Sequence, residues 1–143
     1  MIAFLFLALI SIAQSSDQSE RPWKLRDFTT DGCTVIANGD SENPKKWEHC
    51  CLSHDLAYWA GGSWTERNEA DLAFKHCLED VGEKTLAFFG YLGLRASGTA
   101  LLPTPFRWGY GWTGVRGYWS LTPEEKAEVT RRTPATLSVK ISN

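Results

Sequence analysis

The residues that could do chemistry are concentrated between positions 50 and 58, where two adjacent cysteines precede a histidine and an aspartate. If this stretch is helical, Cys50 shares a face with His54, and Cys51 shares the neighbouring face with Asp55, because residues four apart stand above one another. Each face then carries one cysteine and one polar group. An imidazole suits general-base work, and a carboxylate can support it or hold a metal ion.

The four cysteines, at positions 33, 50, 51 and 77, can pair in three ways. Adjacent cysteines rarely bond to each other, because the geometry is strained, so two pairings remain. A bond between Cys50 and Cys77 would hold a second helix beside the His54 face, and antiparallel packing then brings Asp71 toward His54. The register favours this pairing. The register does not exclude the other pairing, Cys33 with Cys50 and Cys51 with Cys77, because Cys77 does not lie squarely on the Asp71 face.

The remaining bond of the favoured pairing, between Cys33 and Cys51, would place Asp31 and Gly32 near Asp55. Carboxylates and a backbone carbonyl are hard oxygen ligands, which suit calcium. The sequence therefore favours a calcium site beside the histidine. An ordinary turn at Asp31 and Gly32 is the standing alternative.

Turn and capping residues indicate the elements that must position these groups. Helices are expected at about 44–60, 66–80 and 84–102, with a short one beginning at 123. Pro44 would begin the first helix and Gly61 and Gly62 would end it, whereas Ser63 or Thr65 would cap the second. We therefore expect a small all-α domain linked by disulfides, with two antiparallel active-site helices and a third helix covering them.

Two later segments admit two interpretations each. The largely apolar stretch 84–102 could be a buried helix or a membrane span, and Arg95 near its middle would cost a span roughly 2.5–3.5 kcal/mol. The buried helix is therefore favoured. The aromatic run at 106–119 could pack across the helices or seat the protein at a lipid surface, and packing is favoured.

Composition and the N-terminus narrow the class of protein. The 143 residues hold 15 Lys and Arg against 17 Asp and Glu, and the net charge of −2 gives no electrostatic basis for binding nucleic acid. The apolar run 2–10, followed by Ser11 and Ala13, is typical of a signal peptide over residues 1–13. In an exported protein the cysteines are expected to be paired. Removal of the signal peptide would leave one mature domain, residues 14–143, with an aromatic-rich C-terminal extension.

The stretch CCLSHDLAYW resembles the active-site helix of the secreted phospholipase A2 superfamily, which carries C-C-x-x-H-D-x-C-Y. The matching positions are Cys50, Cys51, His54, Asp55 and Tyr58. Asp71 and Cys77 reproduce the spacing on the family's other catalytic helix, and residues 31–33 are similar to the metal loop of its short microbial members. The resemblance covers about residues 29–78.

The resemblance implies a secreted, calcium-dependent hydrolase that cleaves the sn-2 ester of glycerophospholipids. In that reaction His54 takes a proton from the attacking water, Asp71 orients and stabilises the imidazole, and Tyr58 supports Asp71. Asp55, Asp31 and the Gly32 carbonyl would hold Ca²⁺, which polarises the ester carbonyl. We expect a monomer that meets its phospholipid substrate at a membrane or micelle surface.

Departures from the family's pattern favour a compact, microbial-type member. Ala57 stands where most members have another cysteine, the glycine-rich metal loop of the animal enzymes is absent, and the stretch between His54 and Asp71 is too short for their β-hairpin. Two other hypotheses remain: a non-catalytic, lipid-binding relative that keeps the scaffold, and a zinc-dependent hydrolase using the histidines and cysteines of positions 49–77.

Overall fold

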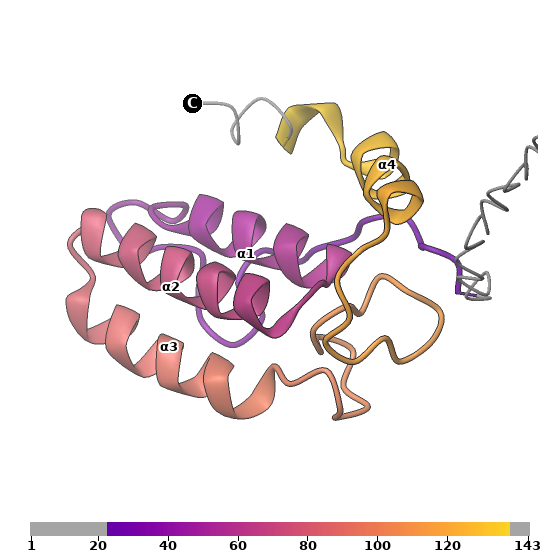
Figure 1. Cartoon of the computed structure of the whole chain (residues 1–143). Coiled ribbons are helices and arrows are strands. Elements are labelled where there is room, and N and C mark those ends of the chain that lie inside the picture. Colours follow the sequence, from indigo (N-terminus) through magenta and orange to yellow (C-terminus); the bar gives the residue numbers. More distant parts are fainter. Residues whose placement is uncertain (1–22, 138–143) are drawn as a thin grey trace, which may run out of the picture.

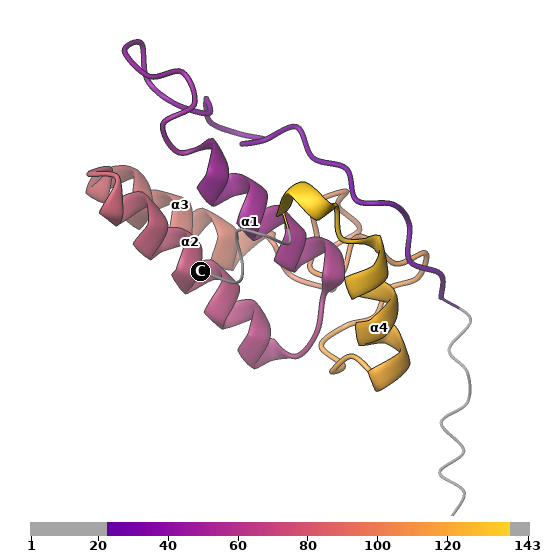
Figure 2. The same cartoon turned by 90° about the horizontal axis from the view of Figure 1, so that it is seen from above.

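The computed structural model describes residues 23–137, and the expected signal peptide lies outside these residues. Its main helices are α1 (Glu48–Ala60), α2 (Trp64–Asp80), α3 (Lys84–Ser97) and α4 (Pro123–Arg132). The first three lie side by side with α2 in the middle, and α4 stands at the end of the molecule where α1 finishes (Figures 1 and 2). Within the described residues the fold is all-α, and Leu25 and Trp112 form an isolated β-bridge. None of these helices is long and apolar enough to cross a membrane.

The start of α1 differs from the prediction. Pro44 lies in a turn, and the helix begins at Glu48 after Trp47, which provides no side-chain cap. Trp47 is fixed to the preceding loop instead: its backbone N–H donates to the Asn38 carbonyl at 3.0 Å, and its indole N–H donates to the Ala37 carbonyl at 2.6 Å. These bonds hold residues 44–47 outside the helix, so a tertiary contact overrides the proline signal.

The turn between α1 and α2 forms as the sequence predicts. Gly61 and Gly62 take positive φ angles of 69° and 146°, which residues with side chains rarely adopt. Ser63 then caps α2 by accepting from the backbone N–H of Glu66, whose carboxylate accepts from the backbone N–H of Ser63. The reciprocal bonds fix the point at which α2 departs from α1.

Two disulfides hold the helices, in the pairing that the sequence favours. Cys50 of α1 bonds Cys77 of α2, and Cys51 bonds Cys33 in the preceding loop. Bonds of this kind stabilise a small domain by about 2–4 kcal/mol each, mainly by restricting the unfolded chain. The two half-cystines on α1 bond different partners, so the N-terminal end of α1 is linked both to α2 and to the loop that carries Cys33.

The third helix is shorter than predicted and covers less of the other helices. It ends at Ser97 with Gly98 as its C-cap, and Gly98 passes so close to Tyr58 that a Cβ atom there would lie 2.5 Å from the tyrosine hydroxyl. It packs against α2, Ala87 is its one buried residue, and Phe88 and Phe89 are 53% and 65% exposed. The expectation that this helix covers both preceding helices was wrong, since α2 lies between α3 and α1 (Figure 1).

The aromatic run mainly packs, as favoured. Trp108 and Trp112 are buried, and their indole N–H groups donate to the carbonyls of Gly62 and Ala60 at 2.8 and 2.7 Å. These bonds fasten the run to the turn between α1 and α2. The same segment is also joined to the chain near Leu25, because the backbone N–H of Arg26 donates to the Gly111 carbonyl at 2.8 Å.

Candidate functional site

The structure brings His54 and Asp71 together. His54 Nε2 lies 3.0 Å from Asp71 Oδ1, and the two residues are only 7% and 0% exposed. One comes from the middle of α1 and the other from the middle of α2, and the disulfide Cys50–Cys77 fixes the two helices nearby. Since Asp71 occupies Nε2, the imidazole keeps Nδ1 as the atom that can accept a proton.

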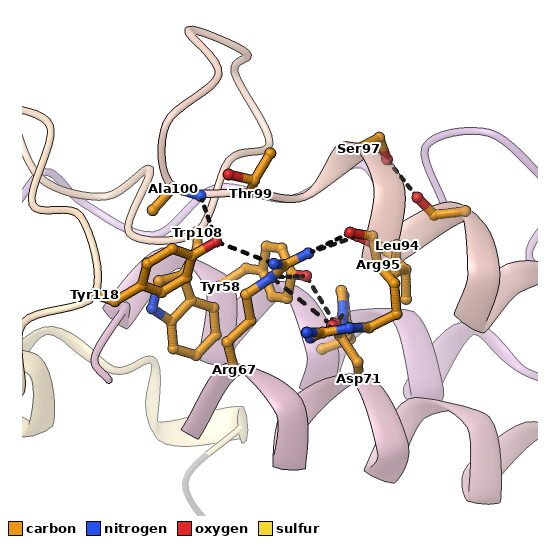
Figure 3. A network of polar contacts seen from close by, with 12 residues as sticks. Tyr58, Arg67, Asp71, Leu94, Arg95, Ser97, Thr99, Ala100, Trp108 and Tyr118 are labelled. Atoms are coloured by element: carbon orange, nitrogen blue, oxygen red, sulfur yellow. Dashed lines mark hydrogen bonds and ion pairs between the residues drawn. The ribbon is translucent and has the colours of Figure 1, made fainter. Parts of the chain in front are cut away.

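Asp71 is held by more groups than sequence reasoning identified (Figure 3). The hydroxyl of Tyr58 donates to Oδ1 at 2.7 Å, and Arg95 Nη1 donates to Oδ2 at 2.7 Å. The guanidinium of Arg67 lies 3.8 Å from Oδ2. Burial alone would raise the pKa of Asp71, but the hydrogen bonds from His54, Tyr58 and Arg95 outweigh it and hold that pKa below its usual range.

Arg67 connects this centre to α3 and to the aromatic run. Its side chain is fully buried, and it donates to the hydroxyls of Tyr58 and Tyr118 at 3.1 and 3.0 Å and to the Leu94 carbonyl at 2.8 Å (Figure 3). Burial and the neighbouring Asp71 charge raise the pKa of Tyr58, so its hydroxyl stays protonated and acts as a donor. The support of Asp71 is thus a closed network in which the polar groups satisfy one another.

The two arginines were missed, although each had a signal in the sequence. Arg67 lies four residues before Asp71 on a predicted helix, the spacing at which opposite charges meet. Arg95 interrupts an apolar stretch, and a cation in such a position needs a carboxylate partner. Its guanidinium also lies 4.7 Å from the centre of the Trp64 ring, where a cation is attracted to the aromatic face.

Of the proposed calcium ligands, Asp55 and Asp31 line a cavity that His54 does not line, and Gly32 is not among the residues that line it. Asp55 and Asp31 line one cavity of about 990 Å³, together with Thr30, whose hydroxyl donates to Asp55 Oδ2 at 2.6 Å. Burial raises the pKa of Asp55, and the Asp31 charge adds to this effect, whereas the Thr30 bond and the His54 charge oppose it. Gly32 is buried at a φ of 82°, with the Asn38 side chain against it.

These residues fit a calcium ion by the chemistry of their donors. Asp55 is half-buried and forms no ion pair within residues 23–137, and a second carboxylate lies near enough to raise its pKa. A cation between two such carboxylates would offset both burial and repulsion. The Gly32 carbonyl has no hydrogen-bond donor in the described part of the chain, so it is free to serve as a ligand.

His54 is not among the residues that line the cavity of Asp55. His54 lines a smaller, largely apolar cavity of about 120 Å³ with Phe74 and Ala57, on the face of α1 turned toward α2. The two regions are linked through the chain itself, because His54 and Asp55 are consecutive, and the charge of His54 lowers the pKa of Asp55.

Zinc has little support in this arrangement. Among residues 23–137, the one group of three metal-ligating side chains is His49, Cys50 and Cys77. Its two sulfurs are bonded to each other, and a half-cystine is not the thiolate that zinc requires.

No protein-family model, curated protein or solved structure matches this chain.

Proposed function

We propose that this chain is a calcium-dependent hydrolase of the phospholipase A2 type, which cleaves the sn-2 ester of glycerophospholipids. The observation that carries the proposal is the buried His54–Asp71 pair, at 3.0 Å, on the helix that also presents Asp55 to an open cavity. The motif around His54 is local in sequence, and the contact with Asp71 adds how the two helices meet.

The dyad supplies the proton chemistry. If His54 Nε2 keeps its proton and donates a hydrogen bond to Asp71, Nδ1 carries the lone pair and takes a proton from water as the water attacks the ester carbonyl. Asp71 stabilises the imidazolium that results, and the hydroxyl of Tyr58 holds Asp71 in place. The imidazolium then returns its proton to the departing glycerol oxygen, which leaves a free fatty acid and a lysophospholipid.

Asp55, Asp31 and the Gly32 carbonyl would hold Ca²⁺, which supplies charge stabilisation for the oxyanion when bound. In this proposal α1 and α2 are the antiparallel active-site helices. Pairs between them run in opposite order along the chain, since Cys50 meets Cys77 and His54 meets Asp71.

The lipid substrate is supported by the apolar residues that line the cavity. Pro103, Pro105 and Phe106 line it beside the acidic residues, and Phe106 is 41% exposed. Apolar and charged residues in one cavity suit a ligand with acyl chains and a charged head. Secretion of a monomer belongs to the proposal, and the two disulfides are compatible with an oxidising compartment.

Fatty-acid release from phosphatidylcholine vesicles tests the proposal. We expect release by the wild type, its loss in EGTA, its return with added calcium and its loss in His54→Gln. His76→Gln is the matched control, because His76 is exposed on α2 and outside the dyad. Release by His54→Gln at the wild-type rate would refute the role of the dyad, and no release by the wild type would refute the function.

A non-catalytic, lipid-binding protein is the second candidate. The observation that favours it is the outer face of α3, where Phe88, Phe89 and Leu92 are 53%, 65% and 47% exposed. Binding to the same vesicles without release would support this function in place of the first.

A further inference from the structure

The arginines of the described chain fall into two groups. Five form ion pairs with carboxylates: Arg67, Arg95, Arg116, Arg131 and Arg132. The other two, Arg26 and Arg107, form no ion pair within residues 23–137, and both line the cavity that holds Asp55. Two positive charges that form no ion pair within the described residues therefore face the same space as the carboxylates of Asp55 and Asp31.

The two guanidinium groups are held close together. Arg26 Nη2 donates to the Tyr110 carbonyl at 2.7 Å, and Arg107 Nη2 donates to the Gly114 carbonyl at 3.3 Å. Both also reach the carbonyl of Trp112, each at 3.5 Å. Burial lowers the pKa of Arg107, and the neighbouring charge of Arg26 lowers it further, so the pair repels itself where it stands. An anion between the two would remove that repulsion.

The wall that carries Arg107 also holds polar atoms without partners. Its Nε and the hydroxyl of Thr104 are buried and form no hydrogen bond within the described part of the chain. Both residues line the same cavity. Buried donors of this kind are costly in a folded protein, and a bound water or ion is one way in which they are satisfied.

We propose that Arg26 and Arg107 form a subsite for the phosphate group of a lipid substrate, in the cavity that the carboxylates of Asp55 and Asp31 also line. A guanidinium presents its donors in a fork that matches phosphate oxygens, and two of them neutralise a phosphate more fully than one. The inference rests on the proposed function, because it assigns the substrate's head to the same cavity. The apolar lining residue Phe106 favours a phosphate attached to acyl chains over a free one.

Calorimetric titration separates this subsite from catalysis. The protein carries His54→Gln, so that nothing is cleaved, and calcium is present. The probes are dihexanoyl phosphatidylcholine below its micelle concentration and dihexanoylglycerol, which lacks the phosphate. We expect Arg26→Gln and Arg107→Gln each to weaken binding of the phospholipid by about tenfold to a hundredfold and to leave binding of dihexanoylglycerol unchanged.

Three further variants control for folding and for charge. Arg26→Lys and Arg107→Lys keep the charge without the fork, so we expect a smaller loss than in the Gln variants. Arg131→Gln removes an exposed arginine of α4 that pairs with Glu128, and it should bind both probes like the parent protein. Far-ultraviolet circular dichroism identifies any variant that has lost its helices, and its Lys counterpart then provides the comparison.

The outcomes distinguish this inference from the function on which it rests. Equal phospholipid binding by the parent and the arginine variants, or no phospholipid binding by the parent, overturns the subsite. Inorganic phosphate that displaces the phospholipid at equal concentration overturns its lipid part. If the subsite is confirmed but wild-type protein releases no fatty acid from vesicles, the proposed function fails and the phosphate site stands.

Discussion

His54 and Asp55 are neighbours on α1, yet their surroundings differ in burial and in the number of polar partners. On the His54 side, two helices joined by a disulfide enclose a histidine, an aspartate and a tyrosine whose hydrogen bonds are made within the protein. On the Asp55 side, loops border a cavity of about 990 Å³ that holds carboxylates and arginines with few partners. The first region is complete in the folded chain, whereas the second presents charges to whatever binds there.

The two carboxylates on these sides show the difference in energetic terms. Asp71 has a lowered pKa, because hydrogen bonds from charged and polar neighbours outweigh its burial. Asp55 has a raised pKa, because its burial is opposed mainly by one threonine hydroxyl. The fold thus stabilises the negative charge of Asp71, which would orient the base. It does not compensate the negative charge of Asp55, which a bound cation would stabilise.

The largest effect is expected from Asp71→Asn, which breaks the complete region. The amide cannot stabilise an imidazolium, so fatty-acid release should fall by about 10³- to 10⁴-fold. Arg95 and Arg67 would lose their buried partner, and the free energy of unfolding should fall by about 3–5 kcal/mol. Release assays and urea unfolding measure the two effects. A variant with wild-type activity would show that Asp71 has only a structural role.

Removing each disulfide separately should affect the two regions unequally. Each double Cys→Ala variant should lose about 2–5 kcal/mol of stability. Loss of Cys50–Cys77 frees α2 from α1 and should reduce activity even at saturating calcium. Loss of Cys33–Cys51 frees the loop that carries Asp31 and should mainly weaken calcium binding. Release rates across a calcium titration distinguish these results, and identical titrations for the two variants would contradict the separation.

Calcium titration by calorimetry sharpens the view of the open region. We expect Asp55→Asn to weaken calcium binding by about a hundredfold and Asp31→Asn by about tenfold, because Asp55 is half-buried and Asp31 is exposed. Without calcium, Asp55→Asn should unfold at a higher urea concentration than the wild type, since a carboxylate with a raised pKa is replaced by a neutral group. Unchanged affinity in Asp31→Asn would remove Asp31 from the ligand set.

A smaller effect is expected from Tyr58→Phe, which removes one bond to Asp71 and keeps the ring. The aspartate retains His54 and Arg95, so activity should fall by only about tenfold. The Arg67 Nε would lose an acceptor, and stability should fall by about 1–3 kcal/mol. Tyr91→Phe, on α3 outside the network, is the matched control. A loss of activity as large as that of Asp71→Asn would show that Tyr58 does more than support the aspartate.

The smallest expected effect is a change in stability at acid pH. A carboxyl group whose pKa is lowered in the folded protein contributes stability that is present above its unfolded pKa, near 4, and is lost as the pH falls through the folded value. The stability difference between wild type and Asp71→Asn should therefore shrink between pH 7 and about pH 3. Urea unfolding at several pH values measures it. A difference that does not change with pH would mean that the Asp71 pKa is not lowered.

Some features of the fold could be predicted from the sequence because they depend on residues close together in the chain. Gly61 and Gly62 end α1, Ser63 caps α2, and Thr122 caps α4 with Glu125, each through bonds that span three or four residues. The disulfide pairing was favoured by similar reasoning, since the periodicity of one helix places Cys50 and Cys51 on different faces.

The approach of His54 to Asp71 also follows from helical spacing, once one disulfide is assumed. The support of Asp71 by Arg95 does not, because it depends on where α3 crosses α2. The same is true of the start of α1, where a bond from Trp47 to a distant part of the loop displaces the helix from Pro44.

The sequence by itself determined where α1 ends and which residues cap α2 and α4, and it favoured the cysteine pairing that the structure has, because caps and helical periodicity are local properties. The tertiary structure decided that α3 packs on α2 and leaves an apolar face exposed, and that Arg26 and Arg107 meet in one cavity. Those outcomes depend on which loops come together in space, and contacts between residues far apart in the chain are set by the packing of the whole domain.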